Sequence, residues 1–107
     1  MLSSNSNRQI KELIKLQNQA KYRKKSGMFV AEGAKLVAEA AHYGKLQKIY
    51  IAESSQGGEE ERIQPLLEEF PYEVVSEEVF AEITDTVTPQ GVLGLVQMPK
   101  YTMEEIL

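Results

Sequence analysis

Seven basic side chains near the start of the chain have the type and spacing to bind a polyanion. Residues 1–25 hold seven of the 12 lysines and arginines but only one of the 16 acidic residues. The seven are Arg8, Lys11, Lys15, Lys21, Arg23, Lys24 and Lys25. The net charge of the whole chain is −4, yet a local cluster can act by itself because exposed charges are screened beyond roughly 8–10 Å. A solvated helix face followed by a basic loop would give the same pattern.

The residues that most active sites require are missing from the sequence. His42 is the only histidine and cysteine is absent, so neither a disulfide nor a thiolate metal site is expected. We expect His42 to be structural or exposed, because no second ligand accompanies it. Neither a Gly-x-Gly-x-x-Gly motif nor a P-loop lysine is present. We therefore predict a binding module with no catalytic, cofactor-binding or metal-binding residue of its own.

Length and hydropathy limit the chain to one modest domain. It has 107 residues, of which 42% are hydrophobic, which is enough for a single core. No apolar run approaches the ~18–20 residues that span a bilayer. The start, Met1–Asn5, lacks the charged-then-apolar order of a signal peptide. Together with the absence of cysteine, this favours a cytoplasmic protein without a membrane segment.

Hydrophobic spacing and cap residues predict alternating helices and strands. In the first half we expect a helix from about Arg8 to about Ala20, a turn over 21–27, a strand over 28–31, a helix from Ala34 to about His42 and a strand over 47–52. A third helix follows, and Pro65 either interrupts it or lies in the first turn of a shorter helix that begins near Gln64. In the second half we expect a strand over 72–75, a helix capped by Ser76, a polar loop over 84–91 and a strand over 92–98 that is buried on both faces.

This alternation predicts a three-layer α/β/α sandwich, with helices on both faces of a mixed or mostly parallel sheet. Residues 101–107 begin a further helical pattern. We therefore expect residues 1–99 to form the domain, and residues 100–107 to start a linker or helix that leads elsewhere.

Three stretches together resemble a known family. They are the basic segment from Asn7 to Gly27, the Met-Phe-Val-Ala-Glu-Gly run at 28–33, and the Ile-Thr-Asp-Thr-Val-Thr-Pro-Gln-Gly-Val-Leu-Gly run at 83–94. Their order and spacing resemble the substrate-binding domain that precedes the catalytic domain in SpoU (TrmH-like) RNA methyltransferases. The resemblance covers about Asn5 to Met98.

The resemblance implies a fold similar to small ribosomal proteins that bind RNA. It also implies a catalytic domain of the SPOUT type, absent from this chain, which binds S-adenosylmethionine, usually forms a homodimer and methylates ribose 2′-hydroxyls, typically in ribosomal RNA. No catalytic or cofactor residue is carried over, because the corresponding motifs are absent here.

Thirteen residues are candidate RNA contacts under this resemblance. The seven basic residues would bind phosphates, which gives salt-dependent affinity without sequence choice. Tyr22 would either stack on an unpaired base or pack against the fold. Glu32 and Gly33 start a helix, where backbone N–H groups suit a phosphate. Glu32 would oppose that anion, so it would instead accept from a base or ribose, or order the loop. The polar loop residues would read a base or 2′-hydroxyl, or merely connect two elements; they are Thr86, Thr88 and Gln90.

Two other functions fit the same sequence. One is a free-standing RNA-binding protein similar to ribosomal proteins and without an enzyme attached. The other is a protein–protein adaptor that uses the acidic remainder of the chain, in which case RNA binding and its salt dependence would be absent.

Overall fold

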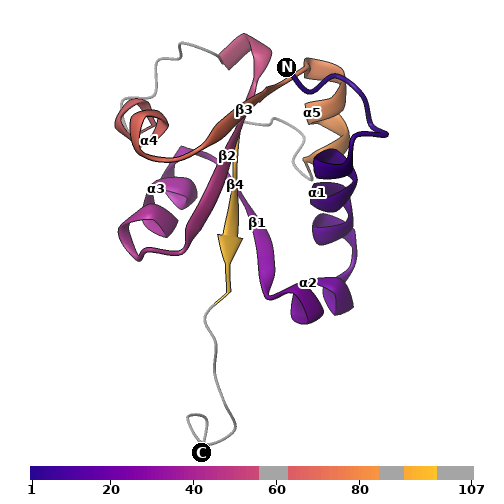
Figure 1. Ribbon diagram of the computed structural model, residues 1–107, viewed down its shortest axis with the longest axis horizontal. Coiled ribbons are helices and arrows are strands. Elements are labelled where there is room, and N and C mark those ends of the chain that lie inside the picture. The colour runs from indigo at the N-terminus through magenta and orange to yellow at the C-terminus, as the bar shows by residue number, and fades with distance from the viewer. Residues whose placement is uncertain (56–62, 85–90, 99–107) are drawn as a thin grey trace, which may run out of the picture.

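The structure is a computed structural model that describes residues 1–55, 63–84 and 91–98 (Figure 1). It begins with two helices that are separated by a sharp break in the backbone. Helix α1 spans Arg8–Asn18, and the side chain of Asn7 caps it by accepting from the backbone N–H groups of Gln9 and Ile10. Gln19 adopts an extended backbone conformation, after which α2 covers Ala20–Ser26. The predicted turn over 21–27 is therefore right only at Gly27, because residues 21–26 belong to α2. Its alanine, lysines and arginine are good helix formers, and only Gly27, with a φ of 71°, turns the chain.

The central sheet is mixed, and its strand order is β1-β4-β2-β3. Strand β1 (Met28–Glu32) pairs with β4 (Val92–Gln97) in antiparallel fashion. Strand β2 (Leu46–Ala52) pairs antiparallel with the other side of β4 and parallel with β3 (Tyr72–Val75). The last strand of the sequence thus lies in the interior of the sheet. The prediction that it is buried on both faces is confirmed.

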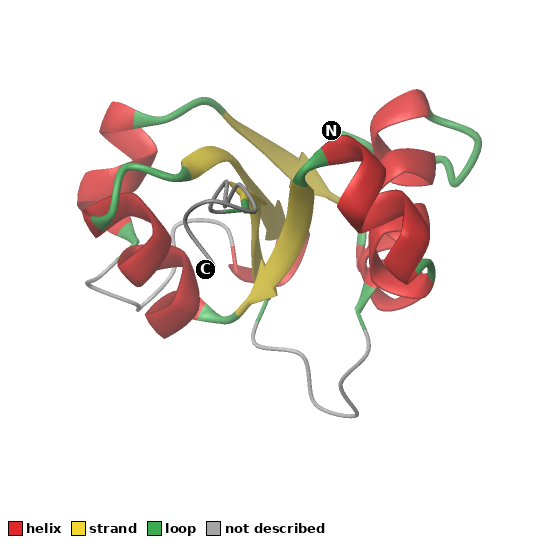
Figure 2. Ribbon diagram, turned by 90° about the horizontal axis from the view of Figure 1, so that it is seen from below, coloured by secondary structure: helices red, strands yellow, loops and turns green. Residues whose placement is uncertain are grey.

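Helices cover both faces of the sheet, as Figure 2 shows, which confirms the predicted three-layer sandwich. One core packs the sheet against α1 and α5 (Glu77–Ile83), which is capped by Ser76 as predicted. The other core packs it against α3 (Ala34–His42) and α4 (Gln64–Glu69). Successive residues of β4 serve the two cores in turn: Val92 and Val96 pack toward α3, and Leu93 packs toward α1.

Helix α4 settles the question left open at Pro65. The helix begins at Gln64, and Pro65 occupies its first turn, where its missing N–H would have no partner in any case. The shorter of the two predicted helices is therefore the correct one. Glu59, Glu60 and Glu61, which the sequence places in a first turn, lie outside the described residues.

One end of the sheet gathers three segments that are far apart in the sequence. The backbone N–H of Met98 donates to the carbonyl of Gly27 at 2.8 Å, and that of Gln97 donates to the carbonyl of Lys45 at 2.9 Å. The end of β4 therefore lies between the end of α2 and the turn that follows α3. We call this end of the strands the amino end of the sheet, because β1 and β2 both start there.

Candidate RNA interface

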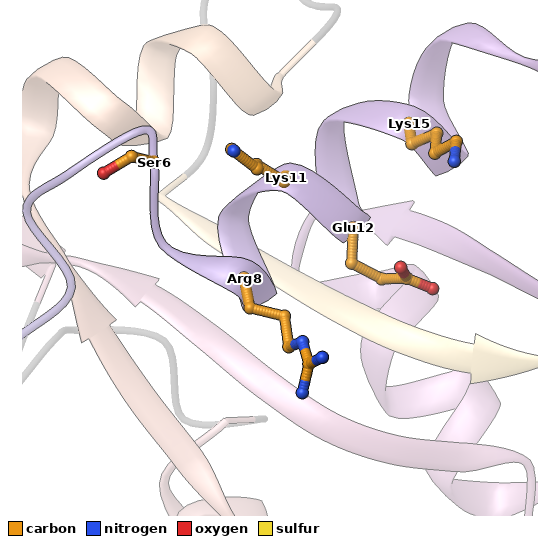
Figure 3. A pocket seen from close by; sticks show the side chains of 5 residues that line it. All are labelled: Ser6, Arg8, Lys11, Glu12 and Lys15. Carbon is orange, nitrogen blue, oxygen red and sulfur yellow. The ribbon is translucent and has the colours of Figure 1, made fainter.

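The exposed side of α1 carries three cations on one helical face. Arg8, Lys11 and Lys15 occupy positions i, i+3 and i+7, and all three are exposed. With Ser6 and Glu12 they line an open depression of about 320 Å³. Figure 3 shows their side chains fanning out from the helix surface. This arrangement suits an extended anion such as a phosphate backbone better than an enclosed small molecule.

A polar clamp fixes α2 against α1. The Tyr22 hydroxyl lies 2.7 Å from both carboxylate oxygens of Glu12, and the Lys15 ammonium lies 4.4 Å from the centre of the Tyr22 ring. The hydrogen bond to Glu12 raises the pKa of Tyr22, because an ionised phenol would face a carboxylate. The lone acid of the basic segment thus orders the cations around it. Tyr22 thus contacts α1 through both its hydroxyl and its ring, which favours the second of its two predicted roles.

Arg23 serves the end of α1. Its Nη1 donates to the backbone carbonyls of Leu16 at 2.6 Å and Gln17 at 3.2 Å. These carbonyls belong to the last turn of α1, where the helix has no further N–H groups to satisfy them. A guanidinium there also meets the negative end of the helix dipole. Arg23 therefore differs from its neighbours in having a structural task.

The three remaining cations of the segment project from α2. Lys21, Lys24 and Lys25 are exposed, and within residues 1–55, 63–84 and 91–98 none of them forms a side-chain hydrogen bond or ion pair. Their ammonium groups remain hydrated until an anion arrives. Together with the cations of α1 they form what we call the basic helix pair.

The other candidate residues lie at the opposite end of β1. Gly33 has a φ of 99°, which favours glycine, and its N–H donates to the carbonyl of Val92 at 3.0 Å. That N–H is therefore already bonded, although Gly33 does precede α3 as predicted. Glu32 is half-buried at the end of β1. Thr86, Thr88 and Gln90 lie outside the described residues, although Val92, two residues beyond Gln90, lies beside Gly33.

The structure thus brings some of the candidates together and separates others. The cations of α1 and α2 share one side of the molecule, while Glu32 and Gly33 are separated from α2 by the five residues of β1, roughly 16 Å. A single nucleotide cannot touch both groups. A longer RNA running along α1 would reach from one to the other.

A polar cluster under α1 was missed by the sequence reasoning. Gln9 Oε1 accepts from Lys48 Nζ at 2.8 Å and from the Tyr50 hydroxyl at 2.9 Å, and Lys48 also pairs with Glu73 at 3.4 Å. Burial and the nearby carboxylate of Glu73 raise the pKa of Tyr50 to about 12. The cluster ties the first turn of α1 to β2 and β3. The one indication of this cluster in the sequence is the presence of polar side chains, Lys48 and Tyr50, at inward positions of the buried strand β2.

The described part of the chain contains neither a candidate metal site nor a helix that could span a membrane. Among those residues there is no group of three or more side chains that could hold a metal ion. No described helix is long and apolar enough to cross a membrane.

A small α/β sandwich with a basic helix pair on one face is a nucleic-acid-binding class of domain. Residues 7–94 match the family described as the MRM3-like substrate binding domain. Because this match covers most of the chain, the protein belongs to that family. The comparison with curated proteins gave no match.

Solved structures give the same assignment. The chain is similar to an RNA 2′-O ribose methyltransferase at 29% identity with a TM-score of 0.77, over 97% of this chain and 40% of the other. It is similar to the AdoMet-bound rRNA methyltransferase from Sinorhizobium meliloti at 25% identity with a TM-score of 0.69, over 94% of this chain and 37% of the other. The chain is also similar to a Porphyromonas gingivalis protein assigned to the TrmH family of RNA methyltransferases, at 29% identity with a TM-score of 0.61, over 92% of this chain and 36% of the other. The chain thus spans about 40% of the length of these relatives or less.

Proposed function

We propose that this chain recognises RNA, ribosomal RNA in particular, on behalf of an S-adenosylmethionine-dependent ribose 2′-O-methyltransferase. The observation that carries the proposal is the basic helix pair: six exposed cations on two helices that Glu12, Tyr22 and Arg23 hold in a fixed orientation. Fixed cations lose less side-chain and segment freedom when they meet phosphates than cations on a flexible loop would. Membership of a substrate-binding family supports the same function.

The place where β4 ends supports a further part of the proposal, that this domain positions RNA for a catalytic domain. Met98 is bonded to Gly27, the residue that ends α2, so a chain that continues past Met98 leaves the sheet beside the basic helix pair. In our proposal, residues 1–99 form the recognition domain and residues 100–107 lead toward a catalytic domain. RNA bound on α2 would then lie next to that domain.

The proposal also covers the cofactor and the assembly of an intact protein. The S. meliloti relative is described as AdoMet-bound, which supports S-adenosylmethionine as the methyl donor of an intact protein. We place cofactor binding, catalysis and homodimer formation outside this chain, and the intact protein in the cytoplasm.

The test is RNA binding at two salt concentrations. The change is Lys21, Lys24 and Lys25 to alanine together, with Arg23 retained because it caps α1. A fluorescent rRNA stem-loop should bind the natural chain with micromolar affinity. If all three lysines meet phosphates, the variant should lower the slope of log affinity against log salt by roughly 2–3, since each phosphate contact contributes ~0.7–0.9.

A matched pair of single variants locates the surface. Lys24→Ala and Lys35→Ala each remove one positive charge from an exposed helical position, on α2 and α3 respectively. Only the first should weaken binding measurably. Equal effects would mean that the chain responds to net charge alone, and failure of the folded natural chain to bind at low salt would favour the adaptor function.

A further inference from the structure

An exposed aromatic pair stands at the end of α3, on the same edge of the sheet as α2. His42 and Tyr43 are both exposed, and 73% of Tyr43 is accessible to solvent. Their ring centroids lie 5.1 Å apart at an interplanar angle of 78°. Neither residue belongs to either core. Tyr43 is therefore exposed at a position where its side chain does not contribute to the packing of the fold.

The backbone that carries this pair is rigid. The N–H of Gly44 donates to the carbonyl of Ala41 at 3.0 Å, and that of Lys45 donates to the carbonyl of Ala40 at 2.9 Å. Gly44 has a φ of 71°, so these bonds close the helix with the turn that glycine permits. Tyr43 therefore stands on a fixed backbone, with its ring nearly perpendicular to that of His42 and the residue largely open to solvent.

This aromatic pair is connected to the basic helix pair through two backbone hydrogen bonds. Lys45 accepts from Gln97, and Gly27 accepts from the adjacent Met98. Strands β1, β4 and β2 are neighbours, so the start of β2 lies only about 10 Å from the start of β1. Figure 1 shows the end of α3 and α2 on either side of the tip of β4. An RNA strand that leaves α2 reaches α3 by crossing this one edge.

We propose that the ring of Tyr43, supported by His42, stacks on an unpaired base of the RNA whose phosphates bind α2. The inference rests on the proposed function and extends it from affinity to recognition of a single-stranded position. Lys24, Lys25 and Lys45 supply positive charge on both sides of this end of the sheet, and Glu39, one helical turn before Tyr43, carries a negative charge. Exposed aromatic rings beside cations are the usual platform for unpaired bases, because every base presents a π-face.

The experiment compares Tyr43→Ala with Tyr43→Phe in the whole chain. One RNA is a stem-loop with 2-aminopurine at an unpaired position, and the other is a fully paired duplex of equal length. The natural chain should quench 2-aminopurine on binding. Tyr43→Ala should abolish that quenching and weaken stem-loop binding about fivefold or more, whereas Tyr43→Phe, which keeps the ring, should behave as the natural chain does.

The controls separate this inference from the proposed function. Leu36→Ala, at an exposed site in the first turn of the same helix, should change neither signal. If Tyr43→Ala binds the stem-loop as tightly as the natural chain, with the same quenching, the stacking role is refuted while RNA binding stands. An equal loss on the duplex would also overturn it, because a paired base offers no free face. If the natural chain binds neither RNA, the proposed function fails and the stacking role fails with it.

Discussion

Single residues decide how the basic segment is used. Seven cations look equivalent in the sequence, yet Arg23 caps α1 and Lys15 packs over Tyr22, while Lys21, Lys24 and Lys25 point to solvent. The difference arises because Arg23 reaches back from α2 to carbonyls at the end of α1. Substitutions of this segment therefore test binding cleanly only at the exposed lysines.

Among the described residues, Tyr50 has a strongly raised pKa. Its folded-state pKa of about 12 lies above its ordinary value of 10.0, so the unfolded chain loses the phenolic proton first as the pH rises. The associated stability is fully present below pH 10 and is lost as the pH rises toward 12. We expect a fall on the order of 2–3 kcal/mol in the free energy of unfolding over this range. Urea titrations at several pH values measure it.

The matched variant for this measurement is Tyr50→Phe. It keeps the ring and removes the titrating hydroxyl, so its stability should depend less on pH between 10 and 12. Tyr22 contributes in the same direction, because its pKa is also raised, and part of the slope should therefore remain. An identical slope in Tyr50→Phe and the natural chain would show that Tyr50 is not the group responsible.

At the scale of elements, the close packing of α3 on the sheet depends on Gly94 in β4. A Cβ atom at this position would lie 2.9 Å from Leu46 Cδ1 and 3.1 Å from Val37 Cγ2. The glycine of the predicted buried strand therefore provides room for a helix, in a place where its neighbours Leu93 and Leu95 face the other core.

Gly94→Val should accordingly destabilise the fold by about 1–3 kcal/mol, because the branched side chain overpacks the interface between α3 and β4. Gly94→Ala should cost less, since the end of the Leu46 side chain can move. Chemical denaturation of both variants gives the values. In a Leu46→Ala background the cost of Gly94→Ala should shrink; an unchanged cost would mean that the clash lies elsewhere.

At the scale of the whole molecule, charge is divided between a basic helix pair and an acidic remainder. The chain is negative overall, at −4, yet one face can orient an approaching polyanion. Under the proposed function, the same division would turn the acidic surfaces away from RNA and make the encounter directional.

Replacing Arg8 and Lys11 by glutamate should therefore slow association with RNA more than it speeds dissociation. The effect should be large at low salt and nearly vanish at high salt, because screening removes long-range steering. Acids in the first turn of α1 suit its dipole, so the helix should persist. Stopped-flow rates measure the effect, and Lys35→Glu on α3 serves as the control. A change confined to dissociation would argue for local contacts without steering.

The sequence alone determined the alternation of elements, the strand over 72–75, the cap at Ser76, the doubly buried final strand and the concentration of positive charge. These follow from side-chain period, cap chemistry and charge counts, which depend on residues near one another in the chain. The family resemblance also rested on such local stretches, and the match over 7–94 confirms it. The thirteen candidate contacts stay predictions.

Only the tertiary structure decided the helix over 20–26, the task of Arg23, the polar cluster around Gln9 and the meeting of α2 with the end of α3. The meeting of α2 with the end of α3 depends on β4 entering the sheet between β1 and β2, which brings Gly27, Lys45 and Met98 to the same end of the sheet. Strand order is set by packing summed over two cores. No local pattern encodes it, because the residues that meet are distant in the chain and become neighbours only when both faces of the sheet are covered.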